Sequence, residues 1–202
     1  MTLIRAYRPS DRNAVAEICT RTGDSGADAT GQFSTDDLLP DIYALPYVER
    51  EPELALMVDA GAGAGAIGYI LGTADTAAFD RWFTDSWWPT VAGKYAAAAT
   101  AGTASEAESR FVRSATVAGG GLPTELLAAY PAHLHIDLLP VTQGMGVGRT
   151  LIDAFCGLLA DRGVPGVHLG VGARNTGAHR FYERTGFTRV GEDGAIWYAK
   201  AL

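Results

Sequence analysis

A glycine-rich turn at 144–148 has the residue types and spacing in this chain best suited to chemistry, because it joins an apolar run to an amphipathic stretch. Gly144, Gly146 and Gly148 have no Cβ, so the backbone can curl there with several N–H groups pointing inward. A helix that follows adds unpaired amides and the positive end of its dipole. We therefore predict a pyrophosphate site, with an ordinary surface turn as the alternative.

The spacing of these glycines argues against a dinucleotide oxidoreductase. The pattern is Gly-x-Gly-x-Gly, whereas the dinucleotide-binding fingerprint is Gly-x-Gly-x-x-Gly at a tight junction of strand and helix. In this chain Val141, Thr142 and Gln143 also separate the apolar run from the turn. A nicotinamide-dependent enzyme is therefore disfavoured.

Alternating strand-like and helix-like segments must position the turn. Apolar periodicity predicts the order β-α, ββ, an inserted segment, βαβα and ββ. We expect strands at 3–7, 54–58, 67–71, 134–139, 167–171, 187–190 and 195–199, and helices at 9–21, 147–161 and 175–184.

Two segments lie between the third and fourth strands. The first, 79–95, is aromatic and contains Trp82, Trp87 and Trp88, so it would either cover a substrate as a lid or fill a core. The second, around 96–121, consists mostly of Ala, Gly, Ser and Thr with few large apolar groups. This composition predicts a mobile insertion.

The composition predicts one soluble domain over 1–202, because 48% of the residues are hydrophobic and 19% are charged. No apolar stretch approaches the roughly 18–20 residues that span a bilayer. The N-terminus becomes charged too early for a secretory signal, so we expect a cytoplasmic protein. Cys19 and Cys156 lie in helix-like apolar patterns and are expected to be buried free thiols.

The net charge of −7 argues against a nucleic-acid partner, because such binding neutralises many phosphates. The charge is uneven: residues 140–202 hold seven Lys and Arg against five Asp and Glu, and residues 1–139 hold nine against eighteen. The predicted anion site lies in the basic part. The acidic part would suit a cationic substrate, or would serve only solubility.

Two motifs together resemble the paired signature of the GNAT N-acetyltransferase superfamily. They are Gln143-x-x-Gly146-x-Gly148 and Asn175-x-x-Ala178-x-x-Phe181-Tyr182-x-x-x-Gly186-Phe187. The segments 41–57 and 68–83 further resemble the acetyltransferase-like domains at the C-terminus of some O-GlcNAc-removing glycosidases, the O-GlcNAcase-like branch. The resemblance implies an α/β (α+β) fold with a central mixed, mostly antiparallel sheet, splayed between the fourth and fifth strands and flanked by helices.

The resemblance also implies acetyl-CoA as co-substrate without a metal, and a small-molecule or peptide amine as acceptor. The net charge and the lack of a long apolar stretch predict no nucleic-acid partner and no membrane association, and a homodimer is possible. The amides of the turn would bind the pyrophosphate. Backbone groups near Leu139 and Val141 would hold the pantetheine arm. The alternative for Gln143 is an ordinary surface-loop residue. The implied cofactor-binding residues are Leu138, Leu139, Val141, Gln143, Gly144, Met145, Gly146, Val147, Gly148, Arg149, Asn175, Ala178, Phe181 and Tyr182.

Tyr182 is the first candidate catalytic residue. Helical spacing places Asn175, Ala178 and Tyr182 on one face at i, i+3 and i+7. The resemblance implies that Tyr182 donates its phenolic proton to the departing CoA thiolate. A packed aromatic beside Phe181 is the alternative.

Asp137 is the second candidate, because an amine must be neutral to attack a thioester. His133, His135 and Asp137 alternate with apolar residues and share one strand face. Partial burial would raise the pKa of Asp137 toward that of a useful base, and structural hydrogen bonding is the alternative for all three residues. Neither these histidines nor His168 and His179 have the spacing of a zinc site.

Two functions follow from the resemblance. The first is an N-acetyltransferase, in which the amine attacks the thioester directly. The second is a module that binds acetyl-CoA without turnover, because the resemblance extends to members of the O-GlcNAcase-associated branch that lack the glycine turn. This chain keeps the turn, which favours binding of the co-substrate in either case.

Overall fold

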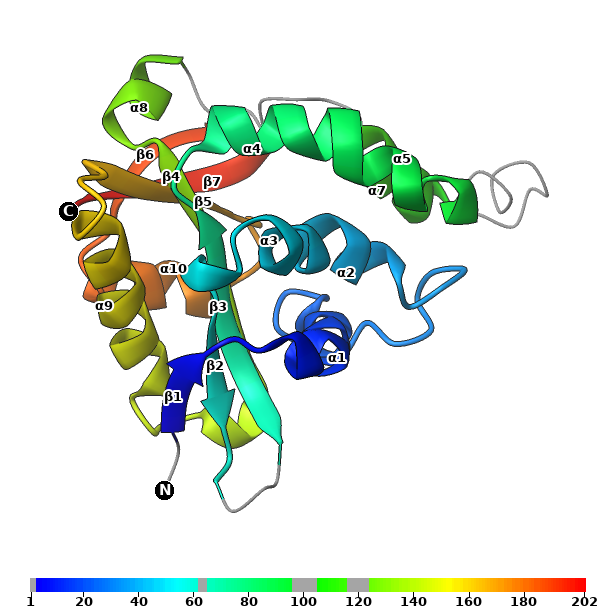
Figure 1. Cartoon of the computed structure of the whole chain (residues 1–202), viewed down its shortest axis with the longest axis horizontal. Helices are drawn as coiled ribbons and strands as arrows, with labels where there is room; N and C mark the ends of the chain where they lie inside the picture. Colours follow the sequence, from blue (N-terminus) through cyan, green and yellow to red (C-terminus); the bar gives the residue numbers. More distant parts are fainter. Residues whose placement is uncertain (1–2, 62–64, 96–104, 116–123) are drawn as a thin grey trace.

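The computed structural model of this chain describes residues 3–61, 65–95, 105–115 and 124–202. Within them, seven strands form one sheet in the order β1-β2-β3-β4-β5-β7-β6 (Figure 1). The predicted succession of seven strands and three helices is confirmed, and the structure adds two short helices before β2 that were not predicted. The strands are β1 (Leu3–Ala6), β2 (Leu56–Asp59), β3 (Ala66–Thr73), β4 (Ala132–Leu138), β5 (Gly166–Val171), β6 (Thr188–Asp193) and β7 (Ala195–Ala201).

β4 and β5 are parallel and soon diverge, whereas the other neighbouring strands pair antiparallel. β4 and β5 pair at only two positions, Ala132 with Val167 and His133 with His168. On its other edge β4 pairs with β3 over 133–138. The C-terminal half of β4 therefore borders a gap, and the predicted mixed, mostly antiparallel sheet with a splay between the fourth and fifth strands is confirmed.

Helices cover both faces of the sheet (Figure 1). Side chains of β3 alternate between two cores, because successive residues of a strand point to opposite faces. Tyr69 and Leu71 pack with α1, α2 and α3, and Ile70 packs with α9 and α10. The helices are α1 (Arg12–Thr22), α2 (Leu38–Tyr43), α3 (Leu45–Arg50), α4 (Thr76–Trp82), α5 (Trp88–Val91), α7 (Glu106–Ser114), α8 (Thr124–Ala129), α9 (Val147–Ala160) and α10 (Thr176–Arg184), with short 3-10 turns at Pro9–Asp11, Pro52–Leu54 and Pro140–Thr142 and a π-helical turn at Phe83–Trp87.

α9 forms because apolar residues recur at helical spacing. Leu151, Phe155 and Leu159 are fully buried on one side of the helix. Cys156 in the same helix and Cys19 in α1 are buried free thiols, as predicted. No helix in the described parts of the chain has the length and apolar character that crossing a bilayer requires.

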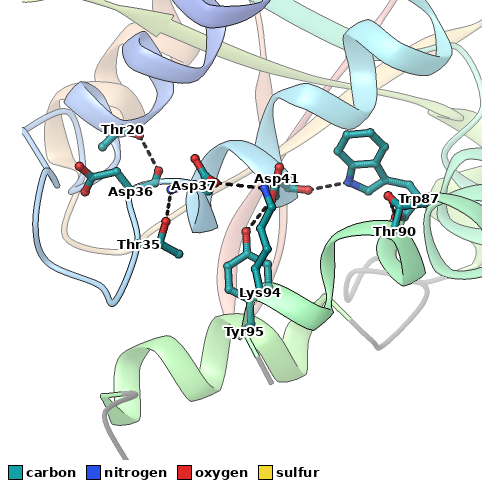
Figure 2. Close-up of polar contacts among 9 residues, drawn as sticks. All are labelled: Thr20, Thr35, Asp36, Asp37, Asp41, Trp87, Thr90, Lys94 and Tyr95. Atoms are coloured by element: carbon teal, nitrogen blue, oxygen red, sulfur yellow. Dashed lines mark hydrogen bonds and ion pairs between the residues drawn. The ribbon is translucent and has the colours of Figure 1, made fainter. Parts of the chain in front are cut away.

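The aromatic segment 79–95 is held against α2 by a buried carboxylate (Figure 2). Asp41 accepts hydrogen bonds from the hydroxyl of Tyr95 at 2.6 Å and from Nζ of Lys94 at 2.9 Å. The indole of Trp87 donates to the backbone carbonyl of Asp41 at 2.8 Å and is itself buried. This part of the segment therefore belongs to the core.

Part of the expected mobile insertion forms α7. Ser105 caps the helix by accepting the N–H of Glu108 at 3.0 Å. The buried carboxylate of Glu108 accepts the N–H and the hydroxyl of Ser34 at 2.9 and 2.5 Å. The sequence analysis did not foresee α7, which is held by this cap, by the carboxylate of Glu108 and by the ring of Phe111 packed edge-on against Phe33 and Tyr43. Its flanks, 96–104 and 116–121, lie outside the described residues.

Gly72 allows β3 and β4 to pack closely against α9. A Cβ at Gly72 would lie 2.3 Å from the carbonyl oxygen of His133 and 2.4 Å from Cζ of Phe155. Because the backbone oxygen cannot move aside, Gly72→Ala is expected to lower the free energy of unfolding by about 2–3 kcal/mol. Gly157→Ala is the matched control, since that glycine lies inside α9 with open space around it and alanine should stabilise by about 0.5–1 kcal/mol. Urea unfolding compares the two variants, and equal stabilities would contradict this account.

Candidate functional site

The glycine turn presents free backbone amides at the start of α9. Gly144 and Gly146 adopt positive φ values of 76° and 71°, and Gly146 is the N-cap of the helix. Within the described residues, their N–H groups and those of 147–149 donate no hydrogen bond. Free amides at a helix N-terminus suit a negatively charged group.

Gly148 lets α9 approach α10 and β4. A Cβ there would lie 3.0 Å from Cζ of Phe181 and 3.3 Å from Cδ1 of Leu138. The guanidinium of Arg149 donates to the backbone carbonyl of Arg184, the last residue of α10. The turn, α10 and the end of β4 are thus held in one arrangement.

The gap beside β4 exposes unpaired backbone groups. Leu139 donates its N–H to the backbone carbonyl of Ile67 in β3 at 3.0 Å, and the carbonyl of Leu139 accepts the N–H and hydroxyl of Thr142. Because hydrogen-bonding direction alternates along a strand, the backbone groups of Ile136 and Leu138 point toward the gap. A ligand at this edge would therefore meet the amide of Leu138. The backbone groups of Leu139, which the sequence analysis proposed for this role, already make hydrogen bonds within the chain.

A cavity of about 500 Å³, hereafter cavity A, lies between β4, α1 and α10. It brings together seven of the residues that the sequence predicts for the site: Asp137, Leu138, Gln143, Asn175, Ala178, Phe181 and Tyr182. Leu139, Val141 and the turn 144–149 do not line it. Val141 and Met145 are 66% and 52% exposed at the surface beside it.

Tyr182 is buried in the wall of cavity A. Its ring packs against Phe181 and Phe187, and within the described residues its hydroxyl makes no hydrogen bond. Burial, and then the charge of Asp137, raise the pKa of Tyr182, so the phenol stays protonated. Asn175 caps α10 by accepting the N–H of Ala178 at 3.1 Å, and its side-chain NH₂ is left available.

Asp137 faces the same cavity from β4. It lies opposite Tyr69 in the β3–β4 register and accepts that residue's hydroxyl proton in a short hydrogen bond. Burial raises the pKa of Asp137, while the hydrogen bond from Tyr69 lowers it. Among the described residues, no group of three or more His, Cys, Asp or Glu side chains is placed to hold a metal ion.

A second cavity of about 490 Å³, hereafter cavity B, lies between α2, α4, β4, β5 and β7 and also borders His135. Tyr43 and His135 line both cavities. The sequence analysis did not assign cavity B, although the i, i+4 spacing of Phe79 and Phe83 was a signal of a shared face. Its further lining includes Tyr47, Thr76, Asp80, Thr84, His133, His168, Asp193 and Trp197.

His133 and His135 both contact the hydroxyl of Tyr47, at 2.7 and 3.0 Å. His168 bonds the backbone carbonyl of Tyr130 through Nδ1 at 2.7 Å. Burial lowers the pKa of all three histidines, and that of His135 falls to about 4. They are therefore neutral at pH 7.

Comparison with known proteins places these elements in one family. The acetyltransferase (GNAT) family model matches residues 117–187, which include β4, the glycine turn, α9, β5 and α10. The mycothiol acetyltransferase of Rhodococcus erythropolis is 48% identical over 67 residues, 33% of this chain and 22% of that protein. This chain therefore matches only about a fifth of the length of that curated relative.

Two solved structures share the whole fold. The crystal structure of SsHAT is 40% identical with a TM-score of 0.88, covering 99% of this chain and 98% of that one. The PaiA N-acetyltransferase of Thermoplasma acidophilum, solved in complex with coenzyme A, is 15% identical with a TM-score of 0.59, covering 100% and 99%. From the family match and the splayed sheet, this chain belongs to the GNAT acetyltransferase superfamily.

Proposed function

We propose that this chain is an N-acetyltransferase that moves the acetyl group of acetyl-CoA to an amine. The observation that carries the proposal is the meeting of two cavities at Tyr43 and His135, beside the gap between β4 and β5. Two substrates that react must each have a binding space, and their reacting atoms must meet at one point. Cavity A suits the thioester, and cavity B suits the acceptor.

The residues present fit acetyl-CoA. The free amides of 144 and 146–149 suit the pyrophosphate, because amides at a helix N-terminus bind phosphate groups. The gap-facing backbone groups of Ile136 and Leu138 suit the amides of the pantetheine arm, which would add to the sheet edge like a strand. The coenzyme A in the PaiA structure supports this assignment for a shared fold.

Tyr182 and Asp137 would serve the reaction from cavity A. Acetyl-CoA supplies an activated thioester whose sulfur must be protonated as it leaves. The hydroxyl of Tyr182 is available as that proton donor, since burial keeps it protonated and the described residues give it no other partner. Asp137, already bonded to Tyr69, would orient groups in the same cavity.

The acceptor is proposed to be an amine that enters cavity B. The carboxylates of Asp80 and Asp193 line this cavity, and the rings of Phe79, Phe83 and Trp197 offer apolar contacts. This lining suits a cationic group carried on an apolar body. About 490 Å³ accommodates a small molecule or the end of a peptide.

Three finer expectations remain proposals. The likeness of 41–57 and 68–83 to the O-GlcNAcase-associated branch suggests a narrower subfamily. A cytoplasmic location and a partner set without nucleic acid or membrane follow from composition and charge. A homodimer stays open to measurement of the mass in solution.

Binding and turnover are tested separately. Calorimetry with acetyl-CoA is expected to show uptake, and NADH is expected to show none. Thiol release is then followed with a panel of primary amines, and Tyr182→Phe is expected to lower kcat about tenfold or more while acetyl-CoA affinity changes little. Tyr7→Phe is the matched control, because Tyr7 lines neither cavity.

Each failure has a distinct meaning. No uptake of acetyl-CoA would contradict the whole proposal. Uptake without thiol release for any amine would instead identify a module that holds acetyl-CoA without turnover. Asp137→Asn, measured alongside, should retain acetyl-CoA binding, because the carboxamide oxygen can still accept the hydroxyl proton of Tyr69.

A further inference from the structure

The hydrogen bonds around His133 fix which of its ring nitrogens carries the proton. The hydroxyl of Thr76 donates its single proton to the carbonyl of Pro131 at 2.7 Å. The same oxygen lies 2.8 Å from Nδ1 of His133, so it must accept a proton from that nitrogen. Because burial keeps His133 neutral, its Nε2 then carries a lone pair.

This tautomer sets the next two bonds along the chain. Nε2 of His133, 2.7 Å from the hydroxyl of Tyr47, must accept the phenolic proton. The oxygen of Tyr47 is then left to accept, and Nε2 of His135, 3.0 Å away, must donate. His135 therefore carries its proton on Nε2, and its Nδ1 has the free lone pair.

His135 is one of the two residues, with Tyr43, at which the two cavities meet. Its ring lines cavity A and cavity B, and it contacts the rings of Tyr43 and Tyr47 at centroid distances of 5.8 and 5.0 Å. Within the described residues no group bonds its Nδ1. A basic nitrogen without a protein partner thus lies at the point where amine and thioester would come together.

We propose that Nδ1 of His135 is the catalytic base that receives the proton of the attacking amine, and that Tyr47, His133 and Thr76 are positioning residues that hold its ring in the active tautomer. The inference rests on the proposed acetyl transfer and adds a base to it. It also explains why two histidines and a tyrosine share one buried hydrogen-bond chain, which apolar side chains of the same size could replace if only packing mattered.

The bonds and protons balance. The amine first loses one proton to solvent, and its neutral nitrogen then bonds to the carbonyl carbon of the thioester while the C–S bond breaks with its electron pair on sulfur. The amine proton passes to Nδ1 of His135, and the hydroxyl of Tyr182 gives a proton to sulfur. Solvent then removes the proton from His135 and returns one to Tyr182.

The groups around His135 allow its neutral form over the working pH range. Burial and the neighbouring His168 lower the pKa of His135 to about 4. The titratable groups that face His135 or its partner Tyr47 are Tyr43 on α2, Tyr47 itself on α3, Glu51 after α3, Asp80 on α4, His133 and Asp137 on β4, and His168 on β5. Cys19, Tyr69 and Tyr182 lie around Asp137.

Chemical rescue distinguishes a base from a structural histidine. His135→Ala is expected to lower kcat about a hundredfold, with acetyl-CoA affinity within twofold of wild type. Imidazole added to the buffer should restore part of this rate, because it can occupy the vacated space and accept the proton. His179→Ala is the matched control, since His179 lines neither cavity, and its rate should neither fall nor respond to imidazole.

The tautomer supplies a readout that needs no turnover. Nitrogen-15 NMR of the wild-type protein is expected to show His135 protonated on Nε2, and Tyr47→Phe should remove that preference. A proton on Nδ1 of wild-type His135, or full activity of His135→Ala, would overturn the proposed base and leave acetyl transfer standing. Wild-type protein that binds acetyl-CoA and acetylates no amine would overturn the proposed function, and the base with it.

Discussion

Gly146→Val is expected to lower the affinity for acetyl-CoA at least about a hundredfold. Gly146 has a φ of 71°, a conformation that a β-branched residue strongly disfavours. Forcing the N-cap of α9 out of this conformation would turn away the free amides of the turn. Loss of two hydrogen bonds to a charged phosphate, each worth about 1.5–3 kcal/mol, accounts for the size of the effect.

Gly163→Val provides the matched control. Gly163 follows the other end of α9 with a φ of 72°, and open space surrounds both glycines. Both variants should lose a similar free energy of unfolding, about 1–2 kcal/mol, because the backbone strain is the same. Only Gly146→Val should lose acetyl-CoA binding in calorimetry. Equal affinities for the two variants would mean that the turn does not hold the phosphates.

Acidification from pH 6.5 to 5 is expected to lower the free energy of unfolding by up to about 5 kcal/mol. His133, His135 and His168 are neutral in the fold because burial lowers the pKa of each. In the unfolded chain their ordinary pKa is about 6.5, so the unfolded state binds more protons as the pH falls. Each histidine therefore removes up to about 1.4 kcal/mol per pH unit.

The loss has a defined window and an opposing contribution. The stability that these histidines provide is complete above about pH 6.5, and for His135 it is lost as the pH falls toward about 4. Asp137 acts in the opposite direction, because burial raises its pKa and the fold binds its proton first.

Urea unfolding at pH 7, 6 and 5 measures this dependence. His135→Gln should reduce the slope of stability against pH by about 1.4 kcal/mol per unit below pH 6.5, because glutamine does not titrate. An unchanged slope in this variant would show that His135 titrates alike in the folded and unfolded chain.

The local signals in the sequence were enough to predict most of the fold. The turn and helix α9 are specified by residues close together in sequence: the glycines at 144–148 and the apolar spacing of Leu151, Phe155 and Leu159. Both could therefore be predicted from that segment alone. The face shared by Asn175, Ala178 and Tyr182 was predicted for the same reason, and the three do line one cavity.

Cavity B could not be predicted in this way, because its walls come from distant parts of the chain. Tyr43, Thr76, His135 and Trp197 belong to α2, α4, β4 and β7. The partners of His133 and His135 depend equally on tertiary packing, since Tyr47 is 86 and 88 residues away in sequence. Helix α7 was missed because its anchors lie far away in sequence: Ser34 bonds the carboxylate of Glu108, and Phe33 and Tyr43 contact the ring of Phe111.

The seam between β4 and β5 consists of only two residue pairs, so the two parts of the sheet are joined there by very little backbone. An extended molecule with its own amides, lying along Ile136 and Leu138, would supply hydrogen bonds that β4 and β5 do not make with each other. Occupancy by such a molecule would then stiffen the scaffold itself, and cohesion of the sheet would depend on the presence of a substrate.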